Sequence, residues 1–194
     1  MTSQLGKGRW ALLAALLVSA AAAQDRLPLC AGCHGADGNS EIPGVPSIAG
    51  QPKLFLETQL VLFREEVRVL PRMQPAAKGA VKGLSDREIT RLAEHYAALR
   101  PRSTGNEPGV DAAQVKRGIA LAQKLHCGSC HLPDFRGRQQ IPRLAGQRED
   151  YLTESMLGYR DNPRGGGDTI MAAALYGLPD ADIRALAHYL SRLR

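Results

Sequence analysis

The sequence predicts an all-α protein made of two copies of one domain, and two observations carry that prediction. The first is an internal repeat with a spacing of about 96 residues: VPSIAGQ at 45–51 matches IPRLAGQ at 141–147, and GLSD at 83–86 matches GLPD at 177–180. The second is that apolar residues recur at helical spacing, and no strand-like alternation surrounds residues 30 or 127. Each copy is therefore expected to be a small helical domain.

The second copy, residues 110–194, displays the elements most clearly. Asp111 is the expected N-cap of its first helix. A loop rich in Gly and Pro follows, then a helix over about 147–159 and a second loop over 161–169. The last helix is expected to start at a cap, Asp180, and its apolar face is formed by Ile183, Leu186, Ala187 and Leu190.

The first copy, residues 24–100, repeats this plan with two departures. Only the six residues 24–29 precede its first cysteine, which shortens the leading helix to about one turn. About four extra residues, roughly one helical turn, lie in the region 76–82. Residues 101–109 are the expected linker between the domains because Pro, Ser and Gly are frequent there.

Each copy also contains the pattern C-x-x-C-H, as CAGCH at 30–34 and CGSCH at 127–131. This pattern is the attachment signature of a c-type haem: two thiols bond to the vinyl groups of the porphyrin, and the adjacent histidine ligates the iron. The expected attachment residues are Cys30, Cys33, Cys127 and Cys130, and the expected iron ligands are His34 and His131.

Two other uses of paired cysteines fit less well. Zinc ribbons space their pairs by about 15–20 residues, whereas Cys33 and Cys127 lie 94 positions apart. A thioredoxin-like redox pair requires a βαβ context, which is missing from the pattern. The two motifs use all four cysteines of the chain, so no disulfide framework is expected. The sequence therefore predicts two covalently bound haem c groups.

The N-terminus resembles a cleavable secretory signal. Lys7 and Arg9 precede an apolar run over 10–18 and a stretch of small residues that ends at Ala23. The run is shorter than the roughly 20 residues needed to span a bilayer. We expect residues 1–23 to be removed and the protein to be periplasmic; an uncleaved membrane anchor is the alternative.

The charge distribution argues against nucleic-acid binding. The formal net charge is +6, but two of the positive charges lie in residues 1–23. The remainder is even: residues 24–104 hold 11 Lys/Arg and 9 Asp/Glu, and residues 105–194 hold 12 and 10. No continuous basic run with interleaved aromatic residues occurs, so nucleic acid is not an expected partner.

The second axial ligand of each iron is expected to be a methionine sulfur, which favours reduced iron and raises the potential. Met73 lies 43 residues after Cys30 and Met171 lies 44 residues after Cys127, whereas Met156 has no counterpart in the first copy. His95 is the alternative ligand in the first copy, and otherwise a helix-face residue like His188.

Together these motifs, the P-x-[IL]-A-G-Q segments, the [FY]-R pairs and both methionines resemble the dihaem cytochrome c4 family over essentially the whole mature chain. The resemblance implies two tandem class I cytochrome c domains, of the cytochrome c553-like kind, related by a pseudo-twofold axis. It implies axial ligation by His34 with Met73 and by His131 with Met171. The carbonyls of Pro46 and Pro142 would accept hydrogen bonds from the proximal imidazoles, and Arg64 and Arg160 are candidate partners of the haem propionates.

With both irons six-coordinate, the expected function is single-electron transfer and not catalysis. A monomer would shuttle electrons from a quinol-oxidising complex to a terminal oxidase or reductase, and it would meet the membrane only through those partners. One alternative is a cytochrome subunit of a larger oxidoreductase such as a flavocytochrome c sulfide dehydrogenase. Another is a dihaem enzyme of the peroxidase or thiosulfate dehydrogenase type, in which one haem is open.

Overall fold

The computed structural model describes residues 26–67, 75–103, 109–161 and 169–194. The expectations for the signal segment 1–23 and for Met73 lie outside these ranges. Within these ranges the regular structure is helical, and the only β-type backbone pairing is an isolated antiparallel bridge between Arg138 and Ile141. No helix in the described ranges is both long and apolar enough to cross a membrane.

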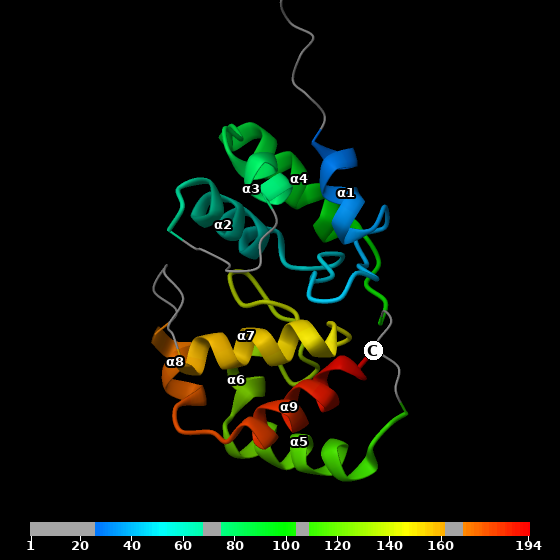
Figure 1. Ribbon diagram of the computed structural model, residues 1–194, viewed down its shortest axis with the longest axis vertical. Coiled ribbons are helices and arrows are strands. Elements are labelled where there is room, and N and C mark those ends of the chain that lie inside the picture. Colours follow the sequence, from blue (N-terminus) through cyan, green and yellow to red (C-terminus); the bar gives the residue numbers. More distant parts are fainter. Residues whose placement is uncertain (1–25, 68–74, 104–108, 162–168) are drawn as a thin grey trace, which may run out of the picture.

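The helices form two groups, with loops of both domains between them (Figure 1). The first domain contains α1 (Leu27–His34), α2 (Lys53–Arg64), α3 (Pro75–Val81) and α4 (Asp86–Ala98). The second contains α5 (Ala112–Lys124), α6 (Cys127–His131), α7 (Glu149–Asp161), α8 (Thr169–Leu175) and α9 (Asp180–Ser191). The all-α prediction is therefore confirmed.

Side-chain caps start two of the longer helices. The Asp111 carboxylate accepts hydrogen bonds from the backbone N–H groups of Ala113 and Gln114, as expected for the N-cap of α5. Ser85 and Glu88 form a capping box at the start of α4. The expected cap of α9 is wrong by one position: Pro179 is the N-cap and Asp180 is the first helical residue. Its charge still lies in the first turn, where the helix dipole favours it.

The core of the second domain is built around α9, which packs against both α5 and α7. The apolar face expected from the sequence is buried, with Ile183, Leu186 and Leu190 at most 2% exposed. Helix α5 approaches closely because Gly118 has no side chain: a Cβ there would meet the carbonyl oxygen of Ala185 and would lie 2.5 Å from the Cβ of Tyr189.

The first domain has no counterpart of α5 among the described residues. Helix α1 begins only three residues before Cys30, which agrees with the short leading segment, and Pro28 suits its first turn. The face of α4 that corresponds to the α5-facing side of α9 carries Arg91 and His95 in place of Ala185 and Tyr189. This face is polar, and no helix among the described residues covers it.

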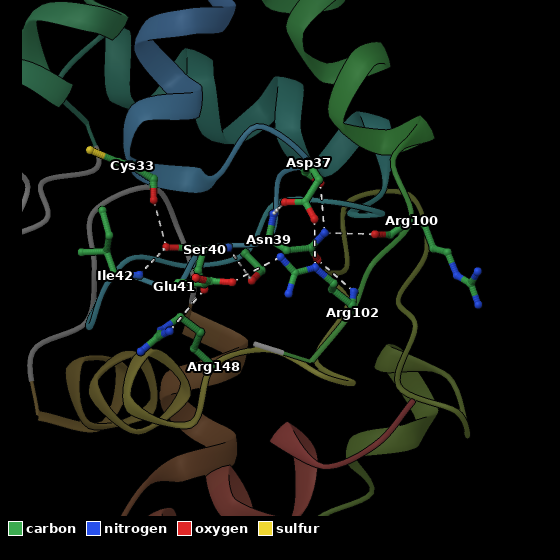
Figure 2. Close-up of polar contacts among 10 residues, drawn as sticks. Cys33, Asp37, Asn39, Ser40, Glu41, Ile42, Arg100, Arg102 and Arg148 are labelled. Carbon is green, nitrogen blue, oxygen red and sulfur yellow. Dashed lines mark hydrogen bonds and ion pairs between the residues drawn. The ribbon is translucent and has the colours of Figure 1, made fainter. Parts of the chain in front are cut away.

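A polar interface joins the two domains. Arg148 is 1% exposed, and its guanidinium donates to the backbone oxygen of Ser40 at 3.2 Å (Figure 2). It also pairs with Asp150, whose Oδ2 lies 3.0 Å from Arg148 Nη2 and accepts the backbone N–H of Gly44 at 2.8 Å. One buried guanidinium and its carboxylate therefore hold the first domain's loop against the start of α7.

The packing at Gly118 predicts that Gly118→Ala destabilises the protein. The added methyl group overfills the α5–α9 contact, which costs about 1–3 kcal/mol. Gly79→Ala in α3 is the matched control, because a Cβ there meets nothing within 4 Å and alanine favours a helix. Guanidinium unfolding of the haem-loaded protein, followed by far-ultraviolet circular dichroism, measures both effects. Equal free energies of unfolding for the two variants would contradict the proposed close approach.

The Asp150 contacts predict an acid-sensitive domain interface. Partial burial alone would raise the pKa of Asp150, but hydrogen bonds from Arg148 and from the backbone N–H groups of Gly44 and Tyr151 outweigh it and hold that pKa below its ordinary 3.8. Because the folded-state pKa is the lower one, this contribution to stability is present at neutral pH and is lost as the pH falls below about 4.

Asp150→Asn should therefore lower the free energy of unfolding by roughly 1–2 kcal/mol at pH 7, and the gap to the unmodified protein should shrink at pH 3. Urea unfolding at both pH values measures this gap. Asp134→Asn is the control, since that carboxylate is exposed and its ion pair is with the neighbouring exposed Arg136. A gap that is the same at both pH values would argue against an ionised Asp150 at the interface.

Candidate functional site

Both C-x-x-C-H motifs lie on short helical segments that place two thiols and one imidazole within little more than a turn. The first occupies the end of α1, and the second is the whole of α6. Cys30 packs against the apolar core of the first domain and Cys127 against that of the second. The pairs lie in different domains, and no described group of three His, Cys, Asp or Glu residues could hold a metal ion. The two cysteine pairs are therefore separated, one in each domain.

The histidine of each motif is oriented by a backbone carbonyl. His34 Nδ1 lies 2.9 Å from the oxygen of Pro46, and His131 Nδ1 lies 2.9 Å from the oxygen of Pro142. A carbonyl only accepts, so each Nδ1 carries the proton and each Nε2 keeps its lone pair for a metal. Burial lowers the pKa of both imidazoles, although the proline carbonyls oppose it. Both rings are therefore held neutral, as iron ligation requires.

A tight turn brings each proline carbonyl back over the motif. In the first domain the oxygen of Gly38 accepts the backbone N–H groups of Ile48 and Ala49 at 2.8 and 2.9 Å. In the second domain the oxygen of Phe135 accepts those of Leu144 and Ala145 at 2.8 and 3.1 Å. Gly38 and Phe135 both have positive φ, at 72° and 54°. The loop geometry is thus repeated along with the sequence.

Ser40 adds a further tie between loop and motif in the first domain. Its Oγ donates to the oxygen of Cys33 at 2.9 Å (Figure 2). Its N–H donates to Ser47 Oγ at 3.1 Å. Ser40 is fully buried. The neighbouring Asn39 binds the segment that follows α4, donating to the oxygen of Arg100 at 3.1 Å and accepting the N–H of Arg102 at 2.8 Å. The motif, its loop and this segment are therefore held together by hydrogen bonds.

Met171 lies inside α8, as its third residue. It packs against the same apolar core as Cys127, which places a thioether on the core that carries the motif. Helices α3 and α8 have equal length and each ends two residues before a matching glycine, Gly83 or Gly177. Position 171 therefore corresponds to 77 in the first domain, so the ligation by Met73 stays a prediction.

The two arginines expected near propionates occupy equivalent places at helix ends. Arg64 Nη1 donates to the oxygen of Leu84 at 2.9 Å and to Asp86 at 2.7 Å. Arg160 Nη1 donates to the oxygen of Leu178 at 2.6 Å and lies 2.8 Å from Asp180. Each guanidinium ties the end of one helix to the start of the last helix in its domain. Their propionate role stays a prediction.

The other histidines differ in their surroundings. His95 is partly buried on α4 and meets the ring of Tyr96 edge to face at 5.0 Å. His188 is 3% exposed: its Nε2 accepts the backbone N–H of Asp111 at 3.0 Å, and its Nδ1 lies 3.1 Å from Glu149. His188 therefore joins α9 to the starts of α5 and α7, a role that spacing alone did not reveal.

Two interface glutamines were not among the candidate residues predicted from the sequence, although both belong to the repeated segments. Gln51 and Gln147 are the last residues of the matched segments 45–51 and 141–147. Each is at most 6% exposed, and each reaches the backbone of the other domain, directly beside a proline that faces a proximal histidine. A buried polar residue repeated at the same position was the clue.

The described residues fit a covalently bound haem in each domain. Two thiols and a neutral imidazole with a free Nε2 share one helical segment, and the cysteine at the start of each motif faces an apolar core. That donor set is the one that c-type attachment uses.

Comparison with known proteins agrees with this geometry. A cytochrome c family model matches residues 21–98 and 115–194. Cytochrome c4 of Pseudomonas aeruginosa is 31% identical over 181 residues, which cover 90% of this chain and 88% of the relative. A thiosulfate dehydrogenase electron acceptor of Thiomonas intermedia is 30% identical over 191 residues, covering 93% and 86%.

The fold has been solved in a relative as well. The reduced recombinant cytochrome c4 of Pseudomonas stutzeri aligns with a TM-score of 0.75 and 28% identity, over 87% of this chain and 95% of that one. Such proteins match both repeated domains over nearly their full length. The match establishes the fold, two tandem cytochrome c domains, and the cofactors, two covalently bound haem c groups. The chain belongs to the dihaem cytochrome c4 family.

Proposed function

We propose that this protein is a periplasmic carrier of single electrons between respiratory or other redox complexes. The observation that carries the proposal is that both proximal imidazoles are anchored alike, by Nδ1 to a proline carbonyl at 2.9 Å. Met171 adds a thioether on the core that holds Cys127. A haem with a fixed histidine on one side and a sulfur on the other leaves no iron position for a substrate.

The chain's contribution to this reaction is rigidity. Haem iron supplies the Fe(III)/Fe(II) couple, and no atom or proton needs to be transferred with the electron. The proline carbonyls, the turns at Gly38 and Phe135 and the buried Ser40 keep each imidazole in one orientation. A ligand that stays in place through the cycle keeps the reorganisation cost low, because the preorganised groups do not move when the charge changes.

The location and partners belong to the same proposal. Attachment through C-x-x-C-H takes place outside the cytoplasm, and the segment 1–23 has the composition of an export signal. A quinol-oxidising complex as donor and a terminal oxidase or reductase as acceptor fit a periplasmic monomer with two haems. Membrane contact is then indirect, through these complexes.

A second candidate function is electron acceptance within a dehydrogenase system. It is supported by the similarity to the thiosulfate dehydrogenase electron acceptor of Thiomonas intermedia over 93% of the chain. In that role the protein would take electrons from a sulfur-oxidising enzyme and would not itself bind the sulfur substrate. Co-purification from the native source separates the two: a stable complex with a dehydrogenase supports this candidate, and isolation as a free monomer supports the shuttle.

The Met171 placement predicts a spectroscopic result. Met171→Ala should remove about half of the near-infrared sulfur-to-iron charge-transfer band of the oxidised protein, if both haems have a methionine ligand. It should also lower the potential of the second-domain haem, on the order of a tenth of a volt or more, because a thioether favours Fe(II). Spectra and a redox titration of the same sample give both values.

Met156→Leu is the control for this experiment. Met156 is 7% exposed within the core of the second domain, and leucine preserves its volume at a cost below about 1.5 kcal/mol. Its band should match that of the unmodified protein. A full band in Met171→Ala, or rapid carbon monoxide binding by the unmodified reduced protein, would speak against two six-coordinate haems and favour the dihaem enzyme.

A further inference from the structure

Gln51 and Gln147 form a reciprocal pair of contacts across the domain interface. Gln147 Oε1 accepts the backbone N–H of Ser47 at 2.8 Å, and its Nε2 donates to the oxygen of Ser47 at 2.7 Å. Gln51 does the same to the residue at the equivalent place: its Oε1 accepts the N–H of Arg143 and its Nε2 donates to the oxygen of Arg143, both at 2.9 Å. Each side-chain amide thus pairs with one backbone residue of the other domain.

The residues contacted in this way follow the two prolines that orient the proximal histidines. The N–H of Ser47 and the C=O of Pro46 belong to the same peptide group, and the latter accepts the hydrogen bond from His34 at 2.9 Å. The N–H of Arg143 and the C=O of Pro142 likewise share a peptide group, and that carbonyl accepts from His131. A continuous chain of hydrogen bonds therefore runs from each glutamine to the histidine of the opposite domain.

We propose that Gln51 and Gln147 are positioning residues that tune the haems crosswise, each acting on the proximal histidine of the domain to which it does not belong. Gln147 acts on His34 through the Pro46–Ser47 peptide, and Gln51 acts on His131 through the Pro142–Arg143 peptide. The inference rests on the proposed electron-carrier function only in that it concerns the potentials of the two haems.

The direction of the effect follows from hydrogen-bond cooperativity. When a peptide N–H donates to an acceptor, the carbonyl of the same peptide becomes more negative and accepts more strongly, by about 10–30% per bond. A stronger acceptor at Nδ1 makes the imidazole a more basic ligand. A more basic ligand stabilises Fe(III) relative to Fe(II), so the intact glutamine contact lowers the potential of the opposite haem.

Two further residues contact the other domain at different backbone groups. Arg148 donates its side chain to the oxygen of Ser40, and Asp150 accepts the N–H of Gly44. These contacts hold the domains together without polarising the Pro46–Ser47 or Pro142–Arg143 peptides. Arg148 does meet Gln147 through its backbone N–H, which donates to Oε1 at 3.0 Å. The glutamines therefore join the two domains and are also hydrogen-bonded to the peptide groups that orient the histidines.

The test compares Gln51→Leu and Gln147→Leu in the haem-loaded full chain, using a redox titration followed by NMR of haem methyl signals assigned to each domain. Gln147→Leu should raise the potential of the His34 haem, and Gln51→Leu that of the His131 haem. At a fixed applied potential we expect the Fe(III)/Fe(II) ratio of the affected haem to fall by about two- to fivefold, equivalent to about 18–41 mV for one electron.

The two variants serve as controls for each other because both remove the same kind of contact from the same interface. A purely structural role would change both haems in both variants, or the haem of the domain that carries the substitution, and either result would overturn the proposal. Unchanged potentials in a folded variant would also overturn it. Gln123→Leu on the exposed face of α5 should leave both potentials unchanged.

A measurement on the unmodified protein covers the case in which a variant fails to fold. The side-chain amide resonances of Gln147 should shift when the His34 haem changes oxidation state, and those of Gln51 when the His131 haem does. Resonances that follow the haem of their own domain would contradict the crosswise path. The near-infrared methionine band of the same sample reports separately on the proposed axial ligation, so failure of one inference is distinguishable from failure of the other.

Discussion

The hydrogen bond between each proximal imidazole and a proline carbonyl is the contact around which both domains are arranged. It decides the tautomer of the ring and leaves Nε2 with a lone pair that can bind a metal, so the chemistry available to the site depends on where that carbonyl lies. The turns at Gly38 and Phe135 and the buried Ser40 serve to place it. The interface glutamines then contact the same peptide groups from the other side.

The two copies keep this contact although their outer parts have diverged. The second domain has α5 against α9, and His188 pairs with Glu149 and with the cap of α5. In the first domain the matching positions are Glu94 and Lys53, which form an exposed ion pair at 2.7 Å. The carboxylate of the pair lies on α7 in the second domain and on α4 in the first, so a buried histidine in one domain corresponds to a solvated carboxylate in the other. This is consistent with the lack of a covering helix over α4 among the described residues.

The interface between the domains is polar, and its hydrogen bonds fix how the two domains pack against each other. Side-chain amides paired with backbone groups fix the register of the two domains, since each donor and acceptor must be met on burial. The Arg148–Asp150 pair has no equivalent in the first domain, where Pro52 and Leu54 occupy the matching positions. The interface is thus symmetric at the glutamines and asymmetric beside them.

Much of this protein follows from its sequence by itself. The two C-x-x-C-H motifs determine the cofactor because thioether attachment needs those residues at that spacing, and the period of about 96 residues determines two domains. The helical spacing of the apolar residues predicted which face of α9 is buried. Residues at that spacing lie on one side of a helix whatever the rest of the chain does. Asp180 was misplaced by one position because two neighbouring residues, Pro179 and Asp180, can both begin a helix.

Contacts between segments that are far apart in the sequence could be identified only from the three-dimensional structure. The burial of His188 depends on α5 and α7 meeting α9, and the glutamine contacts join residues about 100 positions apart. Spacing along one helix carries no information about such neighbours, because they are chosen by the packing of whole elements. The same reason applies to Met171: its place within α8 depends on where that helix begins and ends, at Thr169 and Leu175, and not on its distance from Cys127.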